Sequence, residues 1–405
     1  MNRSKLSFPI GRDKRSLICL LGLPIDVMDL PTAVATIRSA AQTGRRCFIS
    51  TPNLNFLMAA QTDEAFRESV LRSDLSLADG VSLLALARLI GVPLPERVAG
   101  ADLFERLCES KDGPPIKVFF LGGPPDAARL AAEKVNQEAT GVRCVGYDEA
   151  GFGDISSISG QPLIDKINAS DAQFVVVSLG AKKGQAWIMH NQLRLNAPVI
   201  CHLGAVVNFT AGTVRRAPVW MQRCDLEWLW RASTEKGLYK RYWDDGRAFL
   251  KVVARYLLTT TFWARKLDLL FNPEGHQPGE VLQDVRENGV RRMTLKGQWS
   301  RRNASVLSEA LASQPGGALD LEVHQDTWLD LYAIGTLAAF HGQLRSDGGR
   351  GVTIRGASAA LRVQLEHVGV GYLLSDAALG RMDAHKTSNC GGLTPLEFPI
   401  ELDGR

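Results

Sequence analysis

Hydrophobic and polar positions along residues 17–210 follow two different patterns in turn. Short apolar runs predict strands at Cys47–Ser50, Leu75–Leu77, Ile116–Leu121, Val142–Val145, Phe174–Leu179 and Pro198–His202. Between them, apolar residues three and four positions apart predict helices, among them Glu64–Leu71, Val81–Ile90, Ala127–Glu138 and Gln185–Leu195. This alternation predicts an α/β fold, a Rossmann-like parallel sheet with helices on both faces.

Three of the predicted strands run directly into unusual polar or glycine-rich turns. The turns are Thr51-Pro52-Asn53, Ala78-Asp79-Gly80 and Gly122-Gly123-Pro124-Pro125, each followed by a predicted helix. Ligands of such sheets bind beyond the carboxyl ends of the strands, so these turns are the first places to look for a site. Gly122 and Gly123 would let backbone N–H groups approach an anion at a helix start, although such a sequence is more often only a turn.

The pattern changes after residue 212. Residues 213–271 combine basic side chains with tryptophan and tyrosine, and Phe249–Phe271 reads as a long helix, apolar but interrupted by lysine and arginine. Such a helix suits an anionic membrane surface better than a membrane span. A solvated basic face whose aromatic residues pack on a core is the other interpretation, and composition alone leaves both open.

A Pro- and Gly-rich stretch at residues 272–278 predicts a linker. Strand and helix patterns then restart, which predicts a second, small α/β domain over residues 279–377. The complete division is an N-terminal extension (1–16), the main α/β domain (17–212), its basic tail (213–271), the linker, the second domain and a C-terminal tail (378–405).

Composition narrows the classes of function. The net charge of +4 is too mild for a general nucleic-acid binder. Seven cysteines without a C-x-x-C pair suggest neither a disulfide framework nor a zinc site. No window of the sequence reaches the roughly 18 apolar residues that a spanning helix requires, so we expect a cytoplasmic protein.

Five motifs occur in an order that resembles one enzyme family. They are Thr51-Pro52-Asn53, Ala78-Asp79-Gly80, the run Pro95–Asp102 (P-E-R-V-A-G-A-D), Phe120–Gly123, and Arg216–Gln222 followed by Leu226–Arg231. Together they resemble the WecG/TagA/CpsF glycosyltransferases (glycosyltransferase family 26) over roughly residues 17–243. The resemblance implies an inverting transfer from a UDP-sugar to a polyprenyl-diphosphate-linked saccharide during exopolysaccharide or cell-envelope assembly. It places the enzyme at the inner face of the cell membrane.

The resemblance also implies roles for individual residues. Asp79 would be the general base, with Thr51 and Asn53 beside it to hydrogen-bond sugar hydroxyls. Helix capping is the alternative role for Asp79. No two aspartates stand two positions apart, so no D-x-D metal site and no cofactor are expected. The leaving diphosphate would instead meet fixed cations and N–H groups, the candidates being Arg97, Gly122, Gly123, Arg231 and Arg241.

Two positions depart from the family pattern. Where the family usually reads L-G-x-P-K-Q-E-x-W, this chain has Gly184 in place of glutamine and Gln185 in place of glutamate. Gln185 is a candidate to supply the lost polar contact to substrate from the next position. Asp225 stands where the family typically has glycine, and nothing in the sequence explains it.

Residues 279–377 more loosely resemble a STAS domain, but Leu331 stands where such domains carry a phosphorylatable serine. A docking or dimerising module is therefore the expectation, and a homo-oligomer is left open. The rival to an enzyme is a regulatory or scaffold protein of polysaccharide assembly. A dehydrogenase is poorly supported, because no G-x-G-x-x-G follows a strand.

Overall fold

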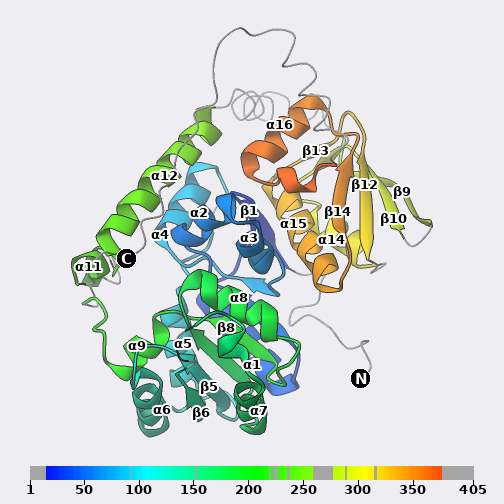
Figure 1. Ribbon diagram of the computed structural model, residues 1–405. Coiled ribbons are helices and arrows are strands. Elements are labelled where there is room, and N and C mark those ends of the chain that lie inside the picture. Colours follow the sequence, from blue (N-terminus) through cyan, green and yellow to red (C-terminus); the bar gives the residue numbers. More distant parts are fainter. Residues whose placement is uncertain are drawn as a thin grey trace.

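Figure 1 shows the protein as a computed structural model. The structure describes residues 15–92, 94–149, 151, 153–218, 220–221, 227–234, 238–258, 277–287, 290–313 and 317–375. Most of the predicted N-terminal extension and linker, and the whole C-terminal tail, lie outside these residues.

The larger sheet has six parallel strands in the order β4-β3-β8-β7-β5-β6. Their bounds are β3 (Cys47–Ser50), β4 (Leu75–Ser76), β5 (Ile116–Gly122), β6 (Val142–Asp148), β7 (Phe174–Ser178) and β8 (Val199–His202). All six strands were predicted, and the Rossmann-like parallel sheet is confirmed. The all-apolar sequence of Phe174–Val177 follows from burial on both faces of a central strand.

Helices cover both faces of this sheet (Figure 1). They are α1 (Leu30–Thr43), α2 (Leu54–Thr62), α3 (Glu64–Leu71), α4 (Val81–Leu89), α5 (Gly100–Glu109), α6 (Ala127–Glu138), α7 (Gln161–Ala169), α8 (Ala181–Asn191) and α9 (Val206–Ala211). Alternate residues of β5 separate the two cores: Val118 and Phe120 pack with α1, α5 and α6, whereas Phe119 and Leu121 pack with α7 and α8. The prediction that α8 begins at Gln185 was wrong, because the helix begins one turn earlier at Ala181.

The apolar run at the start of the chain forms an antiparallel hairpin apart from the main sheet. Strands β1 (Leu17–Leu20) and β2 (Leu23–Asp26) are buried at every position. The turn between them places Leu21 at φ 47° and Gly22 at φ 87°, so glycine suits the second position.

The C-terminal unit is a second α/β body, as predicted. Its sheet has the order β14-β12-β10-β9, in which only β9 runs antiparallel to its neighbour. Its strands are β9 (Glu280–Glu287), β10 (Val290–Lys296), β11 (Gln298–Trp299), β12 (Ala318–Val323), β13 (Trp328–Leu329) and β14 (Gly351–Arg355). Its helices are α14 (Ala304–Ala312), α15 (Leu331–Ser346) and α16 (Ala359–Val368), with a short 3₁₀ turn at Gly371–Leu373.

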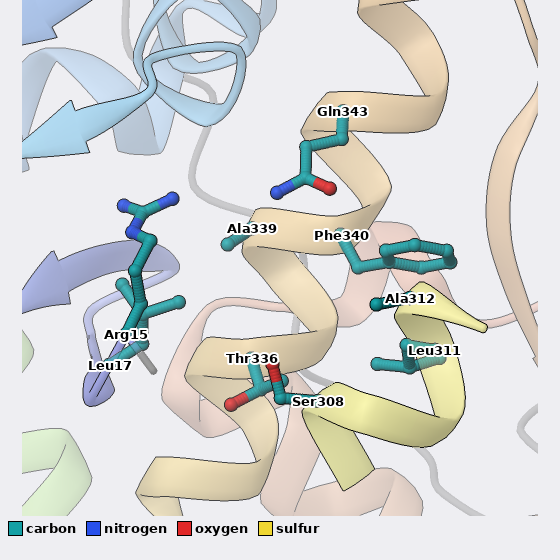
Figure 2. A pocket seen from close by; sticks show the side chains of 9 residues that line it. All are labelled: Arg15, Leu17, Ser308, Leu311, Ala312, Thr336, Ala339, Phe340 and Gln343. Carbon is teal, nitrogen blue, oxygen red and sulfur yellow. The ribbon is translucent and has the colours of Figure 1, made fainter. Parts of the chain in front are cut away.

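The two bodies are packed together through the hairpin and α15. A β-carbon added to Gly335 of α15 would lie 2.6 Å from the carbonyl carbon of Ile18. One added to Gly342 would lie 1.8 Å from the carbonyl oxygen of Leu71, so only glycine permits these backbone approaches. Cys19 is buried in the core of the C-terminal unit. Figure 2 shows a narrow cleft at this junction, with Arg15 across from Ala339 and Gln343 of α15.

The basic tail contains helices α11 (Glu227–Thr234) and α12 (Leu238–Leu258). The predicted helix Phe249–Phe271 therefore begins earlier than expected, and its second half lies outside the described residues. Val253 is buried and Phe249 packs beside it in the core formed by the hairpin, α2 and α4. Among the helices that the structure describes, none is long and apolar enough to cross a membrane.

Candidate active site

The turns after β3 and β4 lie side by side at the carboxyl edge of the sheet. The backbone N–H of Leu77 donates to the carbonyl of Ser50 at 2.9 Å, and that of Asp79 donates to the carbonyl of Pro52 at 2.8 Å. These bonds continue the ladder beyond the strands and bring Asp79 next to Thr51 and Asn53. Thr51 is buried, whereas Asn53 caps α2 by accepting from the N–H of Phe56 at 3.2 Å.

Asp79 does not cap the helix that follows it. The N-cap of α4 is Gly80, at φ 143°, and no side chain bonds there. Instead Oδ2 of Asp79 accepts from the N–H of Gly100, at the start of α5, over a long 3.4 Å. Burial raises the pKa of Asp79 to about 6 against the opposing effects of Arg97 and the Gly100 N–H. A carboxyl with such a pKa is ionised at neutral pH yet basic enough to take a proton.

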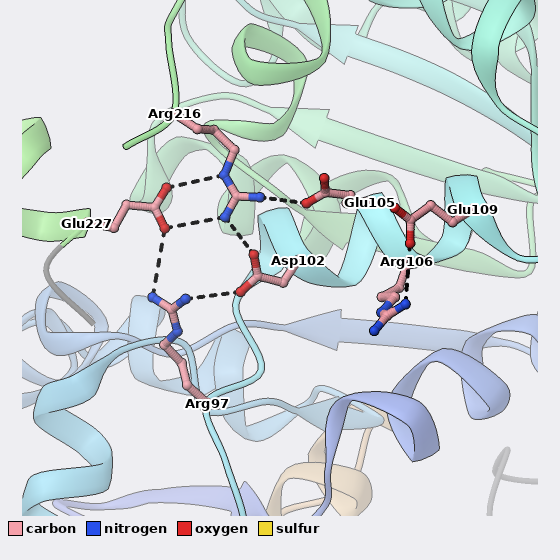
Figure 3. Close-up of polar contacts among 7 residues, drawn as sticks. All are labelled: Arg97, Asp102, Glu105, Arg106, Glu109, Arg216 and Glu227. Carbon is pink, nitrogen blue, oxygen red and sulfur yellow. Dashed lines mark hydrogen bonds and ion pairs between the residues drawn. The ribbon is translucent and has the colours of Figure 1, made fainter. Parts of the chain in front are cut away.

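Arg97 lies in a network of ion pairs that joins the core to the tail (Figure 3). Its guanidinium pairs with Asp102 at 3.0 Å and with Glu227 at 3.8 Å. Arg216 pairs with the same two carboxylates, at 2.6 Å and 3.4 Å, and with Glu105 at 2.8 Å. Glu227 is the first residue of α11, so the network fastens the tail to α5 beside Asp79.

This network was missed by reasoning from the sequence. Asp102, Arg216 and Glu227 stand in the motif runs, but no role was expected for them. The available signal was that all three charged residues stand within motif runs. Arg97 is surrounded by carboxylates in this structure, and its contact to a diphosphate stays a prediction.

Gln185 points inward, to Ser50 at the carboxyl end of β3. It is fully buried in α8, and its Nε2 donates to the hydroxyl of Ser50 at 2.9 Å. Its Oε1 is also buried and has no hydrogen-bond partner among the residues that the structure describes. Because α8 begins at Ala181, position 185 falls on the inner face of the helix, and a direct substrate contact from Gln185 stays untested.

Gly122 and Gly123 lie at the carboxyl end of β5, three strands from β3. At the usual strand spacing this is about 14 Å across the sheet, so these glycines face a different part of the edge from Asp79. Their φ values are 88° and 104°, and a β-carbon on Gly122 would lie 2.8 Å from the carbonyl oxygen of Ser178. At the start of α6, the N–H of Asp126 donates to the carboxylate of Glu149 at 2.8 Å. An acidic group thus already occupies part of this helix start.

The remaining predicted site residues belong to the tail. Arg231 lies in α11 and Arg241 in α12, and their side chains are outside the part of the structure that is described. Within the described residues, no group of three or more histidine, cysteine, aspartate or glutamate side chains is placed to hold a metal ion. Metal independence itself stays a prediction.

Comparison with known proteins identifies the family of the chain. The sequence profile of the glycosyl transferase WecG/TagA/CpsF family matches residues 18–262, more than half of the chain. The chain therefore belongs to this family of glycosyltransferases. The match covers the six-stranded sheet, the hairpin and the described tail, and it stops before the C-terminal unit.

Individual relatives give the same picture. An N-acetylglucosaminyldiphosphoundecaprenol N-acetyl-beta-D-mannosaminyltransferase of Bacillus spizizenii is 29% identical over 194 residues, covering 48% of this chain and 74% of the relative. Proteins of the same name from Bacillus subtilis and Staphylococcus aureus are 26% and 23% identical, covering 54% and 55% of this chain and 83% and 86% of the relatives.

Proposed function

We propose that this glycosyltransferase moves a sugar from a UDP-sugar to a polyprenyl-diphosphate-linked saccharide, with inversion and without a metal ion, in exopolysaccharide or cell-envelope assembly. The observation that carries the proposal is Asp79, a carboxylate at the carboxyl end of β4 whose pKa lies near 6. It would take the proton of the acceptor hydroxyl as that oxygen attacks the anomeric carbon. The names of the relatives support a diphosphate-linked prenyl acceptor.

Thr51 and Asn53 lie next to Asp79 and are proposed to orient the sugar. Arg97 is next to Asp79 and offers a cation for the diphosphate, with Arg231 and Arg241 of the tail as further candidates. Binding of a diphosphate would compete with Asp102 and Glu227 for the Arg97 guanidinium, since an arginine fork binds either group in the same geometry. The Gly122-Gly123 turn is proposed to contact a more distant part of the donor.

The tail is also proposed to hold the protein on the inner face of the cell membrane. Tyr239, Trp243 and Leu250 of α12 are each at least 65% exposed and lie on one stripe, because they are four and seven positions apart. Exposed basic residues form the neighbouring stripe: Lys240, Arg247 and Lys251. Aromatic side chains beside lysine and arginine are the surface that anionic lipid headgroups bind.

The C-terminal unit is proposed to be a STAS-like module that docks on its own transferase domain. Leu331 and Tyr332, at the start of α15, pack against the core formed by the hairpin and α2. The position where a STAS domain would present a serine is thus turned toward the transferase. This contact supports a docking role within the chain and not a phosphorylation switch.

An incubation tests the proposal. The purified chain is mixed with a prenyl-diphosphate-linked N-acetylglucosamine and a panel of UDP-sugars. We expect UDP release that depends on the acceptor, and a disaccharide product whose anomeric configuration is opposite to that of the donor. Glycosyl transfer with retention would contradict the mechanism. Acceptor binding without transfer from any donor would favour the scaffold alternative.

A further inference from the structure

The segment at residues 76–79, which carries Asp79, is hydrogen-bonded along both of its edges. On its inner edge, Leu77 and Asp79 bond to the chain after β3. On its outer edge the described residues supply no neighbouring strand, since β4 is the last strand of the sheet. There the N–H of Ser76 donates to Oδ2 of Asp26 at 2.8 Å, and the carbonyl of Ala78 accepts from the N–H of Val98 at 2.8 Å.

Asp26 thus serves the strand edge as a neighbouring carbonyl would. Its side chain is 1% exposed and sits at the end of β2. Its charge is balanced by Arg15, whose Nε and Nη2 donate to the two carboxylate oxygens at 2.8 Å and 2.6 Å. A bidentate pair of this kind fixes the direction of the carboxylate, and therefore the position of the strand that it bonds.

The hairpin that carries Asp26 is itself fixed by the C-terminal unit. Gly335 of α15 lies against the backbone of Ile18, and the hydroxyl of Tyr372 donates to the carbonyl of Gly22 at 3.0 Å. Arg15 lines one wall of the cleft in Figure 2, whose other wall is formed by α14 and α15. A continuous path of packed groups therefore runs from α15 through the hairpin and Asp26 to Ser76, three residues before Asp79.

We propose that Asp26 is a positioning residue for Asp79, and that the C-terminal unit acts on the transfer reaction through it. The inference rests on the proposed function, in which Asp79 is the general base. Proton transfer requires the base to lie within hydrogen-bond reach of the hydroxyl. A small displacement of the base can therefore lower the rate by more than the energy of the one lost hydrogen bond would suggest. Asp26 is buried between Arg15 and Ser76, so we expect its loss to change the rate of chemistry rather than binding.

Asp26→Asn in the full chain tests the first half of the proposal. It keeps the shape of the side chain and removes the charge that orients it toward Arg15. We expect kcat to fall about 10- to 100-fold while KM changes less than about twofold. Hydrogen exchange of the Ser76 amide should accelerate in the same variant. Rapid exchange at Ser76 with unchanged kcat would overturn the proposal, as would a loss confined to KM.

A pair of matched glycine variants tests whether the C-terminal unit acts on the reaction through Asp26. The pair also keeps the proposal testable if Asp26→Asn fails to fold. Gly335→Ala pushes α15 away from the hairpin, whereas Gly342→Ala pushes the same helix away from Leu71 at the end of α3. We expect faster Ser76 exchange and lower kcat from Gly335→Ala alone. Equal effects of both variants would mean general loosening of the junction and would overturn the path through Asp26. Asp79→Asn is run beside them: if it keeps full activity, the proposed base is wrong, whatever Ser76 exchange shows.

Discussion

The imidazole of His202 lies directly against the backbone of Gly184. A β-carbon added to Gly184 would approach Cδ2 of His202 at 2.1 Å. His202 is buried at the end of β8, and its Nε2 hydrogen-bonds with the carbonyl of Leu179. Glycine is therefore required at position 184, because the His202 ring occupies the space that a side chain there would need.

Gly184→Ala should destabilise the protein by about 2–4 kcal/mol, because neither α8 nor the buried ring can move without breaking other contacts. Gly180→Ala is the matched control: it lies at the start of the same helix with no atom within 4 Å of an added β-carbon, and should change stability by less than about 1 kcal/mol. Chemical denaturation measures both. His202→Ala in the Gly184→Ala background should recover part of the loss, and the absence of any recovery would show that the clash is not with His202.

Sequence reasoning predicted the elements whose patterns are local. The bounds of β3, α3 and α6 agree with the predictions, because their apolar periods are uninterrupted. It did not predict the hairpin, since Leu17–Ile25 is apolar throughout and shows no period that would mark a turn at Leu21 and Gly22. The start of α8 was predicted one turn too late, so the position of Gln185 on the inner face of the helix was not anticipated, and its contact to substrate stays a prediction. The Arg97–Glu227 contact joins positions 130 residues apart, which no local pattern reveals.

Asp79→Asn should lower kcat by about 10²–10⁴-fold with the fold preserved, the usual contribution of a positioned general base. Asp112→Asn, an exposed carboxylate before β5 at the opposite edge of the sheet, is the matched control and should leave kcat unchanged. The Asp79 variant should also be more stable at pH 7.5. The folded pKa of Asp79 exceeds its ordinary value, so keeping it ionised costs stability, here about 3 kcal/mol. The gain should shrink as the pH falls from about 6 toward the ordinary pKa of 3.8 and vanish below about pH 3, where the wild-type carboxyl is protonated in both states. A variant with wild-type turnover would make Asp79 a structural residue.

The pH dependence of transfer should carry the signature of the same carboxyl. Asp79 must be ionised to act as a base, so kcat/KM should rise with pH along a limb with an apparent pKa of about 6. Initial rates between pH 5 and pH 8 at fixed ionic strength measure it. A flat profile across this range, in a form of the enzyme limited by chemistry, would exclude Asp79 as the titrating base.

Transfer should not require a divalent metal ion. The expectation rests on the absence of D-x-D pairs in the sequence and on Arg97 near Asp79. Exhaustive chelation followed by assay in metal-free buffer is expected to leave kcat within about twofold of its starting value. A loss of activity that magnesium or manganese restores would contradict this prediction and would direct attention to carboxylates that bind metal only with the donor present.

The last prediction concerns the surface of α12. Replacing Lys240, Arg247 and Lys251 by glutamine should weaken binding to anionic vesicles by about 100-fold at low salt, since each basic residue near an anionic surface contributes about 1 kcal/mol. Lys111→Gln with Lys134→Gln, which lie on exposed parts of the main domain, should have little effect. Co-sedimentation with vesicles at low and high salt measures both sets, and high salt should reduce the difference between them.

Mutating the aromatic stripe of α12 distinguishes a surface that inserts into a membrane from one that is only basic. Tyr239→Ser with Trp243→Ser should reduce vesicle binding even at high salt, because insertion of apolar side chains is not screened by ions. Leu193→Ser removes an equally exposed apolar side chain elsewhere, 81% exposed, and should not. Point variants are a sharper test than deletion of the C-terminal unit, since deletion would uncover Ile18 and Cys19 and disturb the hairpin. If both tail variants bind vesicles as the wild type does, α12 is an internal strut that packs on α2, and another surface must bring the enzyme to its lipid-linked acceptor.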